Sequence, residues 1–174
     1  MEMFSDKNDK KGARITCRTS SVAETQELGK QIGEFLHSRE EGLCIALVGD
    51  LGMGKTHLAQ GIARGFGITG EVASPTFALM NTYETIDGPL YHFDLYRLDD
   101  SYELENIGFS EFSEGTKCIV EWANKFEEEM PEDIIWVYLE RVNTSENARE
   151  LTLISPFLLE EDLLTIGGRY VFSN

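Results

Sequence analysis

The sequence predicts an α/β fold of three layers, in which helices cover both faces of a mixed central sheet. The first observation is a continuous apolar run at residues 43–48 (LCIALV), which is typical of a strand buried on both faces. A glycine-rich turn and a segment with helical periodicity follow it directly. The third observation is the turn signal DGP at residues 87–89, between strand-like residues 78–86 and 90–96. This arrangement predicts an antiparallel hairpin, so the sheet is expected to be mixed.

The chain begins with a polar, charged and aperiodic stretch. We expect residues 1–13 to be a flexible lead-in and residues 14–174 to form a single domain. Ser21 followed by Glu24 matches a capping box, and apolar residues recur behind it at helical spacing. A helix is therefore predicted over residues 22–37.

The second half of the chain continues the alternation of helices and strands. A helical pattern covers residues 102–112, and a short buried strand is expected at 118–122. Residues 134–142 and 150–155 read as a second antiparallel pair, joined by a polar loop. The last predicted element is a short amphipathic helix at 157–164.

Charge and cysteine content limit the kinds of partner and compartment. The chain has 31 acidic and 15 basic side chains, a formal charge of −16, which argues against direct binding to nucleic-acid phosphates. Cys17, Cys44 and Cys118 form no CxxC pair, so we expect reduced, buried thiols. Since there is no secretory signal and no apolar run of about 18–20 residues, we expect a soluble, cytoplasmic protein that is not held by a membrane.

Residues 49–56 (GDLGMGKT) match the phosphate-binding pattern GxxxxGK[ST] completely. They lie between a buried strand and an amphipathic helix that ends near residue 65 or 67. In this pattern the loop turns its backbone N–H groups inward, Lys55 reaches the β- and γ-phosphates, and the Thr56 hydroxyl binds Mg²⁺. The expected ligand is a nucleoside triphosphate with magnesium, and the expected fold is that of the P-loop NTPases. The residues predicted to bind this cofactor are Asp50, Leu51, Gly52, Met53, Gly54, Lys55, Thr56 and His57.

Phosphoryl transfer also requires a carboxylate near the metal and a group that orients the nucleophile. Glu121 closes the apolar run CIVEW, which is the Walker B position, and a solvated strand end is the alternative. Asp94 lies in YHFDLYRL, where strand alternation puts His92, Asp94 and Tyr96 on one face. That face is either a wall of the site or the exposed side of the hairpin.

Residues 74–77 (SPTF) follow the P-loop helix at the place where such proteins often carry a switch that senses the γ-phosphate. Pro75 favours an extended Ser74 and leaves the Thr76 hydroxyl on a stiffened loop. An ordinary surface loop is the alternative interpretation.

Taken together, the ordered motifs GDLGMGKT, SPTF, HFDLYRL, ELENIGF and VEW resemble the TsaE family of bacterial P-loop ATPases, over about residues 21–149. The resemblance implies a Mg²⁺-dependent ATPase that is weak alone and works with two partner proteins, TsaB and TsaD. TsaD transfers a threonylcarbamoyl group to adenosine 37 of tRNA, and ATP hydrolysis resets the assembly between turnovers. In this scheme tRNA is contacted only indirectly, through the partners.

The resemblance also implies roles for individual residues. Lys55 contacts phosphates, Thr56 and Glu121 hold Mg²⁺, and Thr76 belongs to the switch. Asp94 lies by the γ-phosphate as a base or a water-positioning group.

Two further residues are expected near the nucleotide base by the same resemblance, namely Thr25 and Arg149. A surface helix threonine and a solvated loop arginine are the alternatives. The sequence departs from the family where His57 replaces a common threonine and where Trp122 is followed by Ala123 instead of proline.

Two other functions share the P-loop. A small-molecule kinase would need a lid with clustered arginines, and this chain has no such cluster. A nucleotide-dependent adaptor would act through its bound state and not through turnover. No arginine finger is obvious apart from Arg97, which predicts slow hydrolysis alone and stimulation by a partner. The absence of an NKxD motif favours ATP over GTP.

Overall fold

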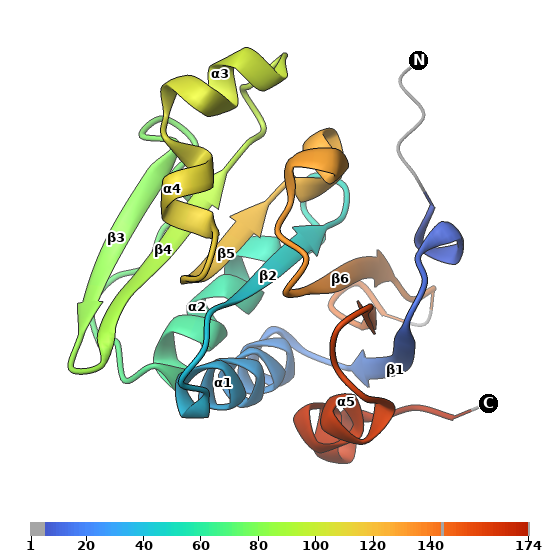
Figure 1. Ribbon diagram of the computed structural model, residues 1–174. Coiled ribbons are helices and arrows are strands. Elements are labelled where there is room, and N and C mark those ends of the chain that lie inside the picture. Colours follow the sequence, from blue (N-terminus) through green and yellow to red (C-terminus); the bar gives the residue numbers. More distant parts are fainter. Residues whose placement is uncertain (1–5, 144, 174) are drawn as a thin grey trace.

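One mixed sheet organises the molecule in the computed structural model, which describes residues 6–143 and 145–173. Seven strands of this part of the chain pair in the order β1-β7-β6-β2-β5-β4-β3 (Figure 1). The strands are β1 (Ala13–Thr19), β2 (Leu43–Val48), β3 (Met80–Thr85), β4 (Gly88–Asp94), β5 (Lys117–Glu121), β6 (Ile134–Arg141) and β7 (Arg149–Ser155).

The centre of the sheet is parallel, as the apolar run at 43–48 predicted. Strand β2 pairs in parallel with both β5 and β6, and β4 pairs in parallel with β5. Every residue of β2 is buried, because helices cover both faces of the sheet. The carboxyl ends of β2, β5 and β4 therefore lie at one edge, where ligands bind in open α/β sheets.

Both predicted antiparallel pairs are confirmed, between β3 and β4 and between β6 and β7. Strand β1, which pairs with β7, was not predicted. Its buried positions are Ile15, Cys17 and Thr19, and they alternate with polar residues, so the apolar signal is weak. Within the expected lead-in at 1–13, residues 1–5 lie outside the described residues and Lys7–Asp9 form a short 3-10 helix.

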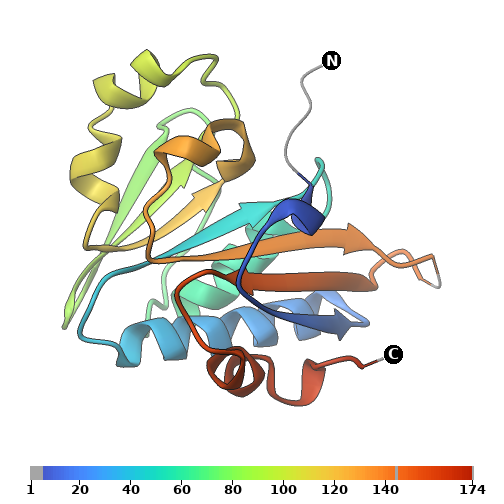
Figure 2. The same cartoon turned by 45° about the vertical axis from the view of Figure 1, so that its right-hand side comes forward.

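Helices cover the sheet on both faces (Figure 2). On one face, α1 and α2 pack with α5 against an apolar cluster, and on the other face a second cluster lies under α3, α4 and the 3-10 helix η2. The helices are α1 (Val22–Ser38), α2 (Lys55–Gly65), α3 (Ser101–Asn106), α4 (Phe109–Ser113), η2 (Ala123–Glu129), α5 (Glu160–Gly167) and η3 (Gly168–Tyr170).

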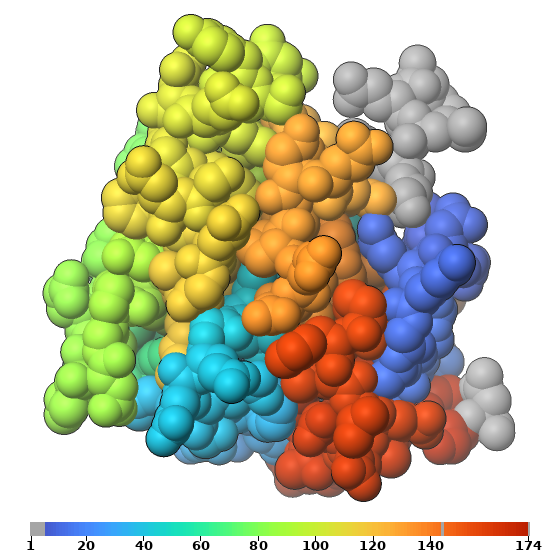
Figure 3. Space-filling view, in the orientation of Figure 1, coloured from blue at the N-terminus to red at the C-terminus, as the bar shows by residue number. Residues whose placement is uncertain are grey.

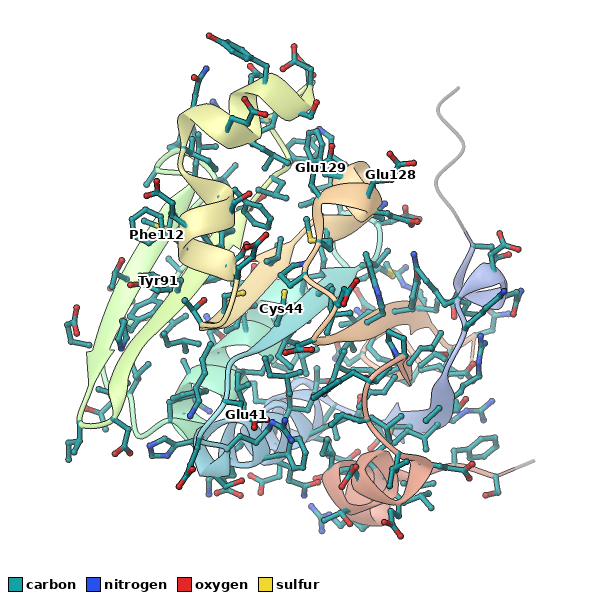
Figure 4. The ribbon with its side chains drawn as sticks, in the orientation of Figure 1. Glu41, Cys44, Tyr91, Phe112, Glu128 and Glu129 are labelled. Atoms are coloured by element: carbon teal, nitrogen blue, oxygen red, sulfur yellow. The ribbon has the colours of Figure 1, made fainter. Side chains whose placement is uncertain are left out.

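The prediction of one continuous helix over 102–112 was wrong. Gly108 has a φ of +72° and separates α3 from α4. A left-handed residue cannot continue a right-handed helix, and glycine adopts this conformation without steric cost. The break lets α4 pack on the sheet, where the ring centroids of Phe112 and Tyr91 are 5.1 Å apart (Figure 4).

The predicted C-terminal helix exists but is displaced along the chain. It spans Glu160–Gly167, whereas we expected 157–164. The Ser155 hydroxyl accepts hydrogen bonds from the backbone N–H groups of Phe157 and Leu158, which holds these residues in a turn before the helix.

The three cysteines are buried and unpaired, in agreement with the prediction from spacing. Burial raises the pKa of Cys17 to about 12. The neighbouring Cys118 thiol and burial together raise the pKa of Cys44, which lies within β2 (Figure 4). Among the described helices, none combines the length and apolar character needed to cross a bilayer.

Candidate functional site

A cleft of about 530 Å³ lies at the carboxyl ends of β2, β5 and β4, beside the start of α2. Sheet register creates it: Glu121 at the end of β5 pairs with Leu47 of β2 on one side and Asp94 of β4 on the other. The lining residues include Val22, Leu51, Gly52, Gly54, Lys55, Thr56, His57, Ser74, Thr76, Asp94, Tyr96, Glu121, Trp122, Arg141, Glu146, Asn147 and Arg149. Most residues of the predicted site therefore meet here.

The loop between β2 and α2 has the backbone of an anion-binding turn. Gly52 and Gly54 have φ angles of +83° and +100°, a region in which a side chain would be strained. Gly54 is the N-cap of α2, and no side chain caps the N–H groups of the first helical turn. These free N–H groups and the helix dipole favour a phosphate at this position.

Lys55 lies inside the loop and is only 6% exposed. Its Nζ donates hydrogen bonds to the carbonyl oxygens of Gly49 at 2.5 Å and Asp50 at 2.9 Å, and it lies 4.3 Å from the centre of the Trp122 ring. Burial lowers the pKa of Lys55, while the carboxylates of Glu121, Asp94 and Asp50 act in the opposite direction. The loop thus holds a cation at the place where phosphates are expected.

Thr56 and Glu121 provide the oxygen atoms that suit magnesium. Both line the cleft, and Glu121 is 2% exposed with its Oε2 atom 2.7 Å from Nε2 of His92. The described residues contain no cluster of three or more His, Cys, Asp or Glu side chains that could hold a metal. One hydroxyl and one carboxylate fit Mg²⁺, which usually completes its shell with substrate phosphates and water.

Asp94 ties the SPTF segment to the end of β4. It is 3% exposed, and its Oδ2 atom accepts hydrogen bonds from the hydroxyls of Ser74 at 2.5 Å and Thr76 at 3.0 Å. Its Oδ1 atom accepts a third from the backbone N–H of Tyr96 at 3.0 Å. The predicted switch, residues 74–77, is therefore hydrogen-bonded to Asp94, the residue predicted to act on the nucleophile.

Burial decides whether the polar face of β4 belongs to the site or is the exposed side of the hairpin. His92 is 0% exposed and Asp94 3%, so the exposed-face interpretation is wrong for both. Tyr96 lies beyond the strand end, is 43% exposed and packs on Trp122 with ring centroids 4.9 Å apart. Asp94 and Tyr96 line the cleft, whereas His92 does not and lies buried beside Glu121.

Arg149 lines the cleft, but its guanidinium is occupied by the protein. Nε donates to the carbonyl oxygen of Met53 at 2.8 Å, and Nη2 to that of Gly52 at 3.4 Å. Nη1 donates to the carbonyl oxygens of Glu146 and Ala148. The residue expected near the nucleotide base thus joins the phosphate loop to the β6–β7 loop.

Thr25 does not reach the cleft, in contrast to the expectation from the resemblance. It is 3% exposed, and its hydroxyl lies 2.7 Å from that of Thr19. Val22, at the start of the same helix, lines the cleft instead. Arg97 also lies away from the cleft walls, with its guanidinium 3.9 Å from the centre of the exposed Phe77 ring.

Sequence reasoning missed the residues at the far end of the cleft. Arg141, Glu146 and Asn147 line it from the β6–β7 region. They carry no motif, and the pairing of β6 with β2 on one side and β7 on the other brings them beside the P-loop.

Comparison with known proteins finds relatives over most of the chain. A family model described as "Threonylcarbamoyl adenosine biosynthesis protein TsaE" matches residues 19–151. The Bacillus subtilis tRNA threonylcarbamoyladenosine biosynthesis protein TsaE is 39% identical over 158 residues, covering 90% of this chain and 89% of the relative. The Haemophilus influenzae protein of the same name is 37% identical, covering 79% and 87%. A crystal structure of Bacillus subtilis YdiB superposes with a TM-score of 0.65 at 31% identity, covering 84% of this chain and 88% of that one.

Proposed function

The chain belongs to the TsaE family, and from this membership and the geometry of the cleft we propose that it is a magnesium-dependent ATPase of tRNA threonylcarbamoyladenosine biosynthesis. The observation that carries the proposal is the convergence of a complete phosphate-binding loop with Thr56, Glu121 and Asp94 in one cleft. Each of these groups has a role in phosphoryl transfer, which depends mainly on positioning and charge stabilisation.

In this proposal Lys55 and the first N–H groups of α2 bind the β- and γ-phosphates. Thr56 and Glu121 hold Mg²⁺, which neutralises charge on the phosphates when bound. Asp94 orients the attacking water or accepts its proton. The burial of Asp94 and Glu121 supports these roles, because buried carboxylates interact more strongly with nearby charges than solvated ones do.

The contacts of Asp94 support slow turnover by the isolated protein. Both of its oxygens already accept hydrogen bonds, from Ser74, Thr76 and the Tyr96 backbone. A bound nucleotide or partner that moves the 74–77 segment would release Oδ2 for water. Arg97 lies over Phe77 and away from the cleft, so a stimulating cation is expected from a partner protein.

The partners we propose are homologues of TsaB and TsaD, with hydrolysis resetting their assembly between turnovers. The formal charge of −16 supports indirect contact with tRNA, through the partners, and association with them by complementary charge. ATP and tRNA are both cytoplasmic, and a cytoplasmic location is part of the proposal.

A nucleotide-dependent adaptor is the second candidate. It is favoured because both oxygens of Asp94 already accept hydrogen bonds from the protein. In that case binding of the triphosphate would be enough, and hydrolysis would be incidental. A small-molecule kinase is less well supported, because it needs several free arginines to clamp an acceptor. Of the two arginines that line the cleft among the described residues, Arg141 and Arg149, the second already donates to four carbonyl groups of the protein.

Calorimetry and phosphate release with the TsaB and TsaD homologues test the proposal. We expect Lys55→Ala to remove most ATP affinity and the surface change Lys30→Ala to leave it intact. Asp94→Asn should keep Mg²⁺–ATP binding and lower the partner-stimulated hydrolysis of ATP by about 10²-fold or more. Asp99→Asn is the matched control and should change neither. Unchanged hydrolysis in Asp94→Asn contradicts the role of Asp94. Full tRNA modification without hydrolysis in that variant would establish the adaptor.

A further inference from the structure

His92 is a buried titratable side chain that the proposed mechanism leaves without a role. It is 0% exposed within β4, and its Nε2 atom lies 2.7 Å from Oε2 of Glu121. We infer that His92 is a positioning residue, which fixes the Glu121 carboxylate in the orientation that holds magnesium. The inference rests on the proposed function, because it gives Glu121 its metal-binding role.

The sheet register brings the two side chains together. In the parallel pair of β4 and β5, His92 is the partner of Ile119 and Asp94 is the partner of Glu121. His92 and Glu121 are therefore diagonal neighbours on one face of the sheet, a spacing that long side chains can bridge. Residues two apart on β4 thus serve the same site, Asp94 at the strand end and His92 two residues before it.

The hydrogen bond to His92 engages one oxygen of Glu121 and leaves the other free for a metal ion. Oε2 accepts from His92, whereas Oε1 has no hydrogen-bond donor among the described residues, and the side chain lines the cleft. A carboxylate held at one oxygen loses its rotational freedom and presents the other in a constant direction. Partners of this kind behind a metal ligand typically change metal affinity or activity by about 10–100-fold when removed.

The surroundings of His92 also determine which ring nitrogen carries the proton. Nδ1 is buried and has no hydrogen-bond partner in the described part of the chain. A proton on Nδ1 would leave a buried donor unsatisfied and would turn the Nε2 lone pair toward a carboxylate oxygen. A proton on Nε2 avoids both costs, so His92 donates to Glu121.

The test compares the affinity of a non-hydrolysable ATP analogue with Mg²⁺ and with a chelator, by calorimetry, in variants of the full chain. His92→Phe keeps a ring in the same space and removes the donor. His92→Gln replaces the donor, because the glutamine Nε2 atom lies about as far from Cβ as the histidine one. His37→Phe, outside the cleft, is the matched control. We expect the Mg²⁺-dependent gain in affinity to fall about tenfold or more in His92→Phe and to recover most of its wild-type size in His92→Gln.

In the presence of the chelator, the affinity of His92→Phe for the analogue should stay within about twofold of the wild-type value. General disruption of the site would not give this result. The same change made on a Glu121→Gln background should have little further effect, because His92 acts through Glu121. A wild-type response to Mg²⁺ in His92→Phe, or no recovery in His92→Gln, overturns the inference alone. A wild-type chain that gains nothing from Mg²⁺ overturns the proposed metal site and the inference with it.

Nitrogen NMR of the His92 imidazole tests the inference on the wild-type protein. This test remains possible even if His92→Phe does not fold. The chain has three histidines, so the His92 signals are assigned by their loss in His92→Gln. We expect a proton on Nε2 in the wild-type protein. An unprotonated Nε2 overturns the inference, since the ring could not then donate to Glu121.

Discussion

Arg149 is the residue that connects the phosphate-binding loop to the distant end of the sheet. Its guanidinium contacts the carbonyl oxygens of Gly52 and Met53 in one loop and of Glu146 and Ala148 in another. The residue is 9% exposed, and its hydrogen bonds involve a charged donor, which makes them stronger than neutral ones. The conformation of the P-loop therefore depends on a side chain that is remote from it in the sequence.

We predict that Arg149→Lys weakens binding of the triphosphate about tenfold, because one ammonium group cannot reach both loops as the planar guanidinium does. Calorimetry measures the affinity, and hydrogen exchange at the amides of residues 50–54 should become faster. Arg39→Lys, outside the cleft, where Arg39 pairs with Glu41, is the control and should change neither. Wild-type affinity and exchange in Arg149→Lys would show that the loop holds its shape without this contact.

At the level of elements, glycines allow α1 and α2 to pack at very short distance. A Cβ atom at Gly61 would overlap the backbone carbonyl oxygen of Gln26, and one at Gly33 would overlap that of Ile62. Backbone atoms cannot move aside as a flexible side chain can. Since α2 begins with Lys55 and Thr56, this packing also sets the position of the site relative to the sheet.

We predict that Gly61→Ala lowers the free energy of unfolding by about 1–3 kcal/mol, the usual cost of overpacking. Alanine alone would raise helix stability by about 1 kcal/mol, so a net loss means that the overlap dominates. Urea unfolding followed by circular dichroism measures the change. Gly70→Ala is the control, because a Cβ atom at Gly70 would meet no other atom within 4 Å, and its effect should stay within about 0.5 kcal/mol. A stabilised Gly61→Ala protein would refute the packing argument.

At the level of the whole molecule, negative charge is concentrated on one side. Residues 99–133 contain twelve Asp and Glu against two Lys, which is a net −10 of the total −16. They build α3, α4 and η2, which lie next to one another on the face shown in Figure 3. Glu128 and Glu129 extend from η2 (Figure 4) and make no ion pair with a described residue. The carboxylates on this face repel one another, and this repulsion lowers the stability of the folded state.

We predict that raising salt from about 0.05 M to 0.5 M stabilises the protein, because a shorter Debye length screens this repulsion. Glu128→Lys should raise the free energy of unfolding by about 0.5 kcal/mol at low salt and by much less at high salt. Thermal unfolding at the two salt concentrations measures both effects. Glu41→Lys, which removes the 3.3 Å ion pair with Arg39, is the control and should not stabilise. Equal effects of Glu128→Lys at both salt concentrations would contradict an electrostatic origin.

Elements with strong local patterns were predictable, and elements defined by distant partners were not. Strand β2 and helix α1 agree with the residues expected for them, because a buried apolar run and a capping box are local signals. Strand β1 was not predictable because Ile15 and Cys17 are buried by distant parts of the chain, in the apolar cluster that includes residues of α1 and α5. The split at Gly108 was missed because one glycine within a helical pattern does not by itself reveal a left-handed conformation.

Two glycines, a lysine and a threonine at fixed spacing between a strand and a helix were enough to identify the phosphate-binding loop from the sequence, because this signal is local. How Arg149 holds that loop, and how the other groups of the site meet it, depends on tertiary contacts. The parallel register of β4 and β5 puts Asp94 beside Glu121 and His92 behind it. The pairing of β6 with β2 and β7 brings Arg149 to the loop, whereas Thr25 of α1 lies against Thr19 of β1, outside the cleft. Strand register is set by burial summed over the whole sheet, so these contacts cannot be derived from the spacing of residues along the chain.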